Sequence, residues 1–198
     1  MGTAMHGLLP DHSPAVLIIL DMISDFDFPD GEAVARAARR IAPTIARLKA
    51  RASRAGIASL YVNDNPGRWR SDSRALIEHC RRPSSRGRVV VEALLPTAQD
   101  YFVLKPRHSA FYATPLEVLL EHLGTKRLIL TGVSSHQCVL FTANDAHVRE
   151  FELVVPSDCI GAPSNRESRF ALHYFASVLG AQVRSAARLD LGSLNRKK

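Results

Sequence analysis

The chain has 198 residues, 46% of them hydrophobic and 23% charged, which indicates a single globular domain whose core needs neither disulfides nor a structural metal. Its formal net charge of +7 does not indicate a nucleic-acid partner, because the arginines of residues 31–54 suit the solvated face of an amphipathic helix and no aromatic residues interleave with them. The three cysteines are widely spaced without a C-x-x-C pair, so we expect free thiols. The apolar runs are too short to cross a bilayer, and the first residues lack a signal-peptide pattern. We therefore expect a cytoplasmic protein without a membrane partner.

Predicted strands and helices alternate along the chain. The unbroken apolar run Ala15–Leu20 predicts a strand that is buried on both faces. Apolar residues at helical spacing predict a helix over Gly31–Arg54, which Pro43 kinks or divides. Strands are further predicted at residues 57–62, 101–104, 127–130, 152–155 and 182–184, and helices at residues 71–80, 114–122, 136–149 and 165–179.

This alternation predicts one doubly wound α/β domain, in which a six-stranded, mainly parallel sheet carries helices on both faces. We expect the domain to span residues 14–186, between an N-terminal tail of residues 1–13 and a basic C-terminal tail of residues 187–198. Ligands of such sheets bind beyond the carboxyl ends of the strands, and this is where chemistry is expected.

Three reactive residues fall at or just beyond predicted strand ends. Asp21 follows the first strand, Lys105 follows the strand at residues 101–104, and Cys138 comes just after the strand at residues 127–130 and its turn. Taken singly, Asp21 could cap a turn, Lys105 could be solvated and Cys138 could be a small buried apolar residue. Their joint placement at one edge of the sheet favours a catalytic site.

The three residue types suit acyl transfer. Cys138 is predicted in the first turn of a helix, where unpaired N–H groups, the helix dipole and a nearby Lys105 would lower the pKa of its thiol. Asp21 could accept the thiol proton and return it to a leaving amine. The N–H groups of the same turn could hold the oxyanion of a tetrahedral intermediate.

Four ordered blocks of sequence give a specific family resemblance. They are Leu17-Ile18-Ile19-Leu20-Asp21-Met22 with Asp25-Phe26 close behind, Lys105-Pro106-Arg107-His108-Ser109-Ala110-Phe111, Gly132-Val133-Ser134-Ser135-His136-Gln137-Cys138-Val139, and Thr142-Ala143-Asn144-Asp145-Ala146. Over these blocks the chain resembles the isochorismatase-like cysteine hydrolases.

The resemblance implies a Rossmann-like fold and an Asp/Lys/Cys triad made of Asp21, Lys105 and Cys138. It also implies a cis peptide between Val133 and Ser134, with the N–H groups of Ser134 and Cys138 directed at the oxyanion. The implied reaction is hydrolysis of a small amide through a thioester, without a cofactor. The resemblance also implies that the protein assembles as a homodimer or homotetramer.

Two departures from the family pattern narrow the expectation. Zinc-containing nicotinamidases carry an aspartate followed by histidines after the second strand, whereas residues 63–70 here read Asn-Asp-Asn-Pro-Gly-Arg-Trp-Arg, without histidine. We therefore expect no metal and no nicotinamidase activity. Ile23 stands where many relatives have glutamine, which removes one polar group near the site.

Five residues are candidates for contact with the substrate: Phe26, Asn63, Arg68, Trp69 and Phe111. Arg68 could pair with a substrate carboxylate and Trp69 could stack on a planar group, although an exposed loop explains both equally well. Phe111 could form a pocket wall or belong to the core. Asn63 and its neighbour Asp64 could orient substrate, but a turn is the simpler explanation.

The sequence thus predicts a metal-independent cysteine hydrolase that cleaves an amide-type C–N bond of a small carboxamide or ureido compound. One alternative is an isochorismatase-type vinyl-ether hydrolase, which would use Asp21 and Lys105 and leave Cys138 idle. The other is a binding protein that keeps the fold without turnover.

Overall fold

A parallel sheet forms the centre of the protein. The computed structural model describes residues 12–65 and 72–196. The strands follow the order β3-β2-β1-β4-β5-β7, with β6 paired to β4, and every described pairing is parallel. The strands are β1 (Ala15–Leu20), β2 (Ala58–Asp64), β3 (Tyr101–Lys105), β4 (Arg127–Val133), β5 (Glu152–Pro156), β6 (Ile160–Gly161) and β7 (Gln182–Arg184).

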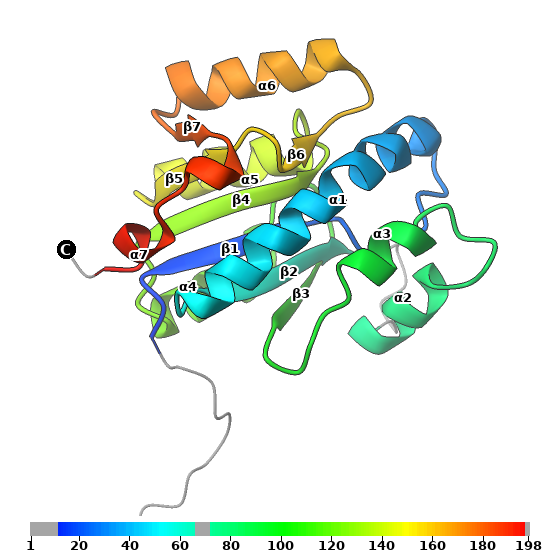
Figure 1. Ribbon diagram of the computed structural model, residues 1–198, viewed down its shortest axis with the longest axis horizontal. Helices are drawn as coiled ribbons and strands as arrows, with labels where there is room; N and C mark the ends of the chain where they lie inside the picture. The colour runs from blue at the N-terminus through cyan, green and yellow to red at the C-terminus, as the bar shows by residue number, and fades with distance from the viewer. Residues whose placement is uncertain (1–11, 66–71, 197–198) are drawn as a thin grey trace, which may run out of the picture.

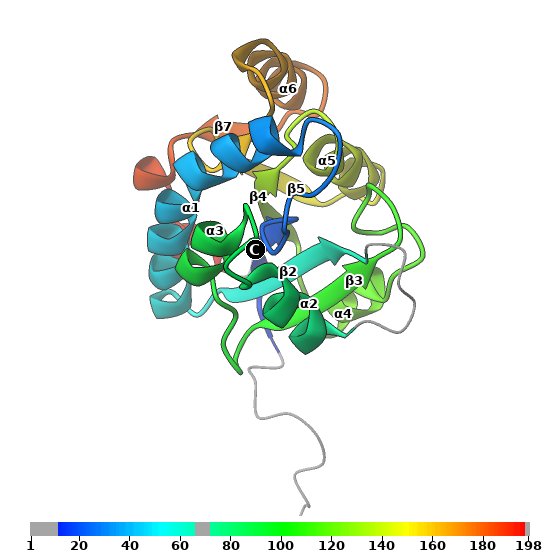
Figure 2. The same ribbon diagram turned by 90° about the vertical axis from the view of Figure 1, so that its right-hand side faces the viewer.

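Helices cover both faces of this sheet (Figure 1). They are α1 (Gly31–Arg54), α2 (Ser73–Cys80), α3 (Arg88–Ala93), α4 (Leu116–His122), α5 (Cys138–Val148), α6 (Asn165–Ser177) and α7 (Leu191–Leu194), with a 3₁₀ turn, η1, at Ala186–Arg188. Figure 2 shows α1 and α3 on one side of the sheet and α4 and α5 on the other. The predicted doubly wound α/β fold is therefore confirmed. None of these described helices has the length and apolarity needed to span a bilayer.

The buried strand β1 supplies both halves of the core. Leu17 and Ile19 pack toward α1 and α3, whereas Ile18 and Leu20 pack toward α4, α5 and α6. All six residues of β1 are fully buried, as an apolar run without polar alternation predicts. A rigid, two-sided central strand fixes the position of whatever follows it, which here is Asp21.

The sheet has one strand more than predicted. The additional strand, β6, has two residues and pairs with Gly132 and Val133 of β4. Strand β4 is also longer than expected, because Thr131 and Gly132 continue the ladder with β1 instead of forming a turn. A two-residue strand has no periodicity to detect, which is why the sequence did not indicate it.

Pro43 neither divides α1 nor ends it, contrary to one expectation. The helix runs unbroken over Gly31–Arg54 with Pro43 inside it. Pro43 lies on the exposed face of α1, so the carbonyl that loses its helical partner can face water.

The residues that follow position 186 pack on the domain at least as far as Arg196. Leu189 and Leu191 are buried, and the Arg127 guanidinium donates to the carbonyl oxygens of Leu194 and Arg196 at 2.9 and 3.1 Å. Arg51 donates in the same way to Ala186 and Leu189, at 2.7 and 2.9 Å. The segment 187–196, expected as a tail, is thus held by buried leucines and by arginine–carbonyl bonds.

Candidate active site

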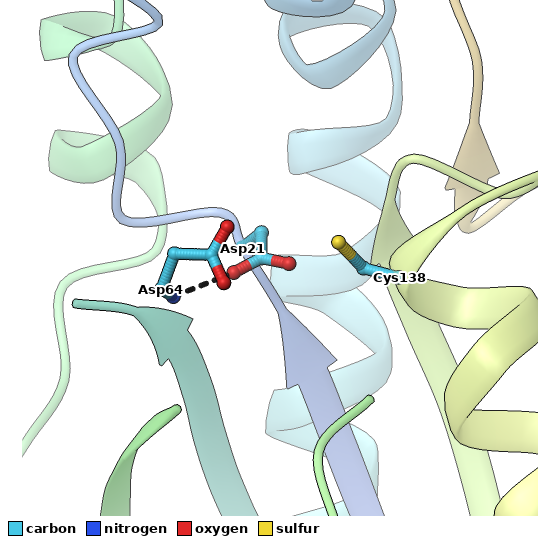
Figure 3. A group of neighbouring side chains, drawn as sticks. All are labelled: Asp21, Asp64 and Cys138. Carbon is cyan, nitrogen blue, oxygen red and sulfur yellow. Dashed lines mark hydrogen bonds between the residues drawn. The ribbon is translucent and has the colours of Figure 1, made fainter. Parts of the chain in front are cut away.

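The ends of four neighbouring strands bring the candidate catalytic residues together. Asp21 directly follows β1, Asp64 ends β2, Lys105 ends β3, and Cys138 begins α5, a few residues after β4. The β2–β3 register places Asp64 directly beside Lys105. In Figure 3 the Cys138 sulfur points toward the carboxylates of Asp21 and Asp64. The described structure therefore brings together the three residues that the sequence singled out and adds Asp64.

The Lys105 ammonium is the centre of this group. Its Nζ lies 2.9 Å from Asp21 Oδ2 and 3.6 Å from Cys138 Sγ, and it also donates to Asp64 Oδ1. The Lys105 side chain is 0% exposed. A buried ammonium requires charged and hydrogen-bonding partners, and two carboxylates and a thiol supply them.

Asp64 is the residue whose place in the site was not predicted. Besides its bond from Lys105, its backbone N–H donates to Asp21 Oδ1 at 2.8 Å, drawn as the dashed line in Figure 3. From sequence alone, a turn is the simpler explanation for this residue. The available signal was its position at the end of β2, next to the strand that carries Lys105.

Cys138 sits at the start of α5, as predicted, and is 7% exposed. The peptide bond between Val133 and Ser134 is cis. Among the described residues, neither the Ser134 N–H nor the Cys138 N–H donates a hydrogen bond, whereas Ser135 N–H donates to the Gly161 carbonyl at 2.6 Å. Within the described structure, these two backbone donors, one in the loop before α5 and one at its first residue, are therefore available to an oxyanion.

The pKa of the Cys138 thiol is raised, not lowered as the sequence suggested. Burial raises this pKa most and the Asp21 carboxylate raises it further, while Lys105 opposes both. The helix-start position alone is therefore a poor guide to the ionisation of this thiol. At neutral pH the resting cysteine is a protonated thiol that needs a base.

Asp21 and Lys105 are shifted by the same surroundings. Burial raises the pKa of Asp21, with Lys105 lowering it and Asp64 raising it again. Burial lowers the pKa of Lys105, but Asp21, Cys138 and Asp64 together outweigh this and leave it raised, so Lys105 stays charged. An aspartate with a raised pKa beside a protonated thiol is suited to exchanging a proton with it.

The same three acceptor side chains could in principle bind a cation. One ligand atom each from Asp21, Asp64 and Cys138 lies within 4.8 Å of the others. The Lys105 ammonium already lies against all three residues and supplies the positive charge that they require. The donor set therefore suits an internal ion-pair cluster better than a metal.

The residues proposed to contact substrate lie in different surroundings. Phe26 is 1% exposed in the core on the α1 side, and Phe111 is 7% exposed in the core on the other side. Asn63 is 1% exposed, its Nδ2 donates to the Ile23 carbonyl at 2.9 Å, and no described residue donates to its buried Oδ1. Arg68 and Trp69 lie outside the described residues.

Phe111 is held by ring contacts that explain its burial. Its ring centroid is 6.0 Å from that of Phe151, and the Arg149 guanidinium carbon is 4.8 Å from the Phe111 centroid. These contacts join the segment after β3 to the residues that connect α5 to β5.

The chain is similar to proteins of one family over most of its length. Residues 15–188 match the isochorismatase domain. The chain belongs to the isochorismatase family. It is 39% identical over 167 residues to the isochorismatase family protein YaaI of Bacillus subtilis, a match that covers 84% of this chain and 91% of YaaI.

Two further relatives are named after an activity. The ureidoacrylate amidohydrolase RutB of Methylorubrum extorquens is 31% identical over 190 residues, with 79% of this chain and 75% of RutB covered. The solved structure of N-carbamoylsarcosine amidase from Thermoplasma acidophilum aligns with a TM-score of 0.66 at 26% identity, covering 89% of this chain and 98% of the amidase. The protein is thus an isochorismatase-family hydrolase, with the site described above at the carboxyl edge of its sheet.

Proposed function

We propose that the protein hydrolyses an amide-type C–N bond of a small carboxamide or ureido compound, with Cys138 as the nucleophile. The observation that carries this proposal is the geometry at Lys105, whose ammonium lies 2.9 Å from Asp21 Oδ2 and 3.6 Å from Cys138 Sγ. A base, a cation and a thiol in mutual contact are the parts that thiol-dependent acyl transfer needs. The amidohydrolase and amidase names of two relatives support the same class of reaction.

The first half-reaction forms a thioester. Asp21 takes the Cys138 thiol proton, and the sulfur attacks the carbonyl carbon of the amide. Lys105 stabilises the negative charge while it is shared between sulfur and carboxylate. The oxyanion accepts hydrogen bonds from the N–H groups of Ser134 and Cys138. Asp21 then donates its proton to the leaving amine, the C–N bond breaks, and an acyl group remains on sulfur.

The second half-reaction releases the acid. Asp21, again a carboxylate, accepts a proton from water, and the resulting hydroxide attacks the thioester carbonyl. The C–S bond breaks, the acid departs, and the proton held by Asp21 returns to the Cys138 sulfur. One water is consumed, and the enzyme regains its starting state. No metal or organic cofactor takes part in these steps.

One observation supports a vinyl-ether hydrolase as the second candidate function. Burial raises the pKa of Asp21, and a protonated aspartic acid could donate a proton to an enol-ether carbon without help from the thiol. This reaction would survive removal of the sulfur. The two chemistries therefore differ in their need for Cys138.

A substrate panel tests the proposal. Small carboxamides, ureido acids and cyclic amides are incubated with the protein and with Cys138→Ala, isochorismate is included, and ammonia and acid release are measured. We expect amide turnover that falls by at least about a thousandfold in the variant. Amide turnover that survives Cys138→Ala would reject the cysteine mechanism, and turnover of isochorismate alone, unchanged in the variant, would support the vinyl-ether alternative.

A further inference from the structure

Asp64 gives the active site a negative charge that the reaction itself does not require. Its Oδ1 accepts from Lys105, while its side chain is 55% exposed, in contrast to 13% for Asp21 and 0% for Lys105. Among the described residues, no hydrogen bond reaches Asp64 Oδ2. Asp64 is therefore the most exposed member of the cluster and the one that an incoming substrate can reach, and within the described part of the chain its Oδ2 is available as an acceptor.

The charges of the cluster do not cancel. Asp21 and Asp64 bring two negative charges and Lys105 brings one positive charge, while Cys138 is a neutral thiol at rest. Transfer of the thiol proton to Asp21 moves a charge within the group and leaves the sum unchanged. Before and after this step, these four residues thus carry one net negative charge.

This charge lies where part of the substrate must lie. Carboxylate oxygens of Asp21 and Asp64 are within 4.8 Å of the Cys138 sulfur and of one another. A carbonyl carbon in contact with the sulfur would place its own substituents within hydrogen-bonding reach of Asp64. Figure 3 shows both carboxylates on the side toward which the sulfur points.

We propose that Asp64 determines which substrates enter, by accepting a hydrogen bond from an N–H of the group that carries the scissile carbonyl and by repelling a carboxylate placed there. This inference rests on the proposed function and narrows it to carbonyl compounds with a neutral N–CO–NH₂ or CO–NH₂ group at the sulfur. Any carboxylate elsewhere on the substrate must point away from Asp64. The ureido and carbamoyl groups in the names of two relatives fit this class.

Alkylation of Cys138 by two matched reagents tests the proposal without a known substrate. Iodoacetamide and iodoacetate react at the same carbon and lose the same iodide, but one carries CO–NH₂ where the other carries a carboxylate. Their second-order rate constants at Cys138 are measured at neutral pH by mass spectrometry of the peptide that contains it. N-acetylcysteine gives the ratio of the two reagents for a free thiol.

We expect the protein to prefer iodoacetamide about tenfold or more beyond the free-thiol ratio, because a half-exposed charge close to the sulfur is only partly screened. Asp64→Asn should bring the ratio close to that of the free thiol, and Asp64→Glu should restore most of the preference. Changes in the pKa of Cys138 cancel in the ratio, since both reagents attack the same thiolate. Glu121→Gln, which neutralises an exposed carboxylate on α4, should leave the ratio unchanged.

Two results would overturn the proposal: a native ratio equal to that of N-acetylcysteine, or a ratio that Asp64→Asn leaves unchanged. These outcomes are independent of the substrate panel. Failure of amide turnover with an intact, Asp64-dependent alkylation preference would reject the proposed function and leave the role of Asp64 standing. Amide turnover without this alkylation preference would support the proposed function and reject the role of Asp64.

Discussion

At the scale of single residues, the site is organised around a lysine that has no contact with solvent. Lys105 is fully buried and has two carboxylates and one thiol as partners. Removing a charge from such a group leaves its partners unpaired, which costs more than the pair contributes when intact. The ionisation of Asp21 and that of Cys138 are therefore linked through this one ammonium.

The titration of Cys138 tests the opposing effects of Asp21 and Lys105 on the pKa of its thiol. Asp21 raises the pKa of the thiol and Lys105 lowers it, so Asp21→Asn removes the first effect and leaves the second unopposed. We expect the pKa of Cys138, which lies above the ordinary value of 9.0 in the native protein, to fall in Asp21→Asn. The ultraviolet absorbance of the thiolate, followed against pH with Cys138→Ala as the blank, measures this.

The same substitution should have the opposite effect on turnover. Without its carboxylate, Asp21→Asn cannot carry the proton to the leaving amine, and hydrolysis should fall by about 10²–10⁴-fold even though more thiolate is present. A variant in which thiolate and turnover rise together would show that Asp21 is not the proton carrier.

The sequence could indicate the reactive residues but not their electrostatics. Asp21, Lys105 and Cys138 are visible because each follows a recognisable strand. The raised pKa of Cys138 depends on burial by residues far away in the chain. The position of a cysteine at the start of a helix gives no information about this burial. The contact of Asp64 with Lys105 depends on β2 and β3 being neighbours in the sheet, and the order of strands along the chain does not by itself show which strands pair.

At the scale of elements, the close approach of β1 and β4 holds Asp21 and the loop that leads to Cys138 in place. Gly132 has φ +111°, and a Cβ added there would lie 2.0 Å from the Leu20 carbonyl oxygen. Leu20 immediately precedes Asp21, and Gly132 immediately precedes the Val133–Ser134 peptide. A glycine is required because only the absence of a side chain allows this contact.

Substitution of this glycine tests the requirement. We expect Gly132→Ala to lower the free energy of unfolding by at least about 3 kcal/mol, because both the positive φ and the backbone clash oppose the new methyl group. Gly180→Ala is the matched control: its φ is +61°, no atom lies within 4 Å of the added Cβ, and the cost should be only about 1 kcal/mol. Equal losses in urea denaturation would show that the clash with Leu20 is relieved at little cost.

Elements with strong periodicity were predicted well, whereas some short ones were missed. The helix over Gly31–Arg54 and the strand over Ala15–Leu20 have the bounds that their apolar patterns predicted. Helix α3 and strand β6 were missed, since six and two residues are too few to show a pattern. The continuity of α1 through Pro43 depends on which face of the helix meets solvent, and that is a property of the packed molecule.

At the scale of the whole molecule, the position of the site follows from the order of the strands. The chain builds β1, β2 and β3 in one direction and then returns to add β4 and β5 on the other side of β1. Loops diverge at such a reversal and leave a crevice at the carboxyl ends of the strands. Asp21 follows β1 and Cys138 follows β4, so the proposed base and the proposed nucleophile flank this point.

The most direct test of the account is to trap the acyl group on Cys138 during turnover. A small amide or ureido substrate found in the panel is mixed with the protein, the reaction is quenched in acid within a single turnover, and the peptides are analysed by mass spectrometry. The account predicts an adduct with the mass of the acyl group on Cys138, absent from Cys80 and Cys159, which are buried elsewhere. Rapid amide hydrolysis in the native protein, with no adduct at any time point and undiminished turnover in Cys138→Ala, would contradict it.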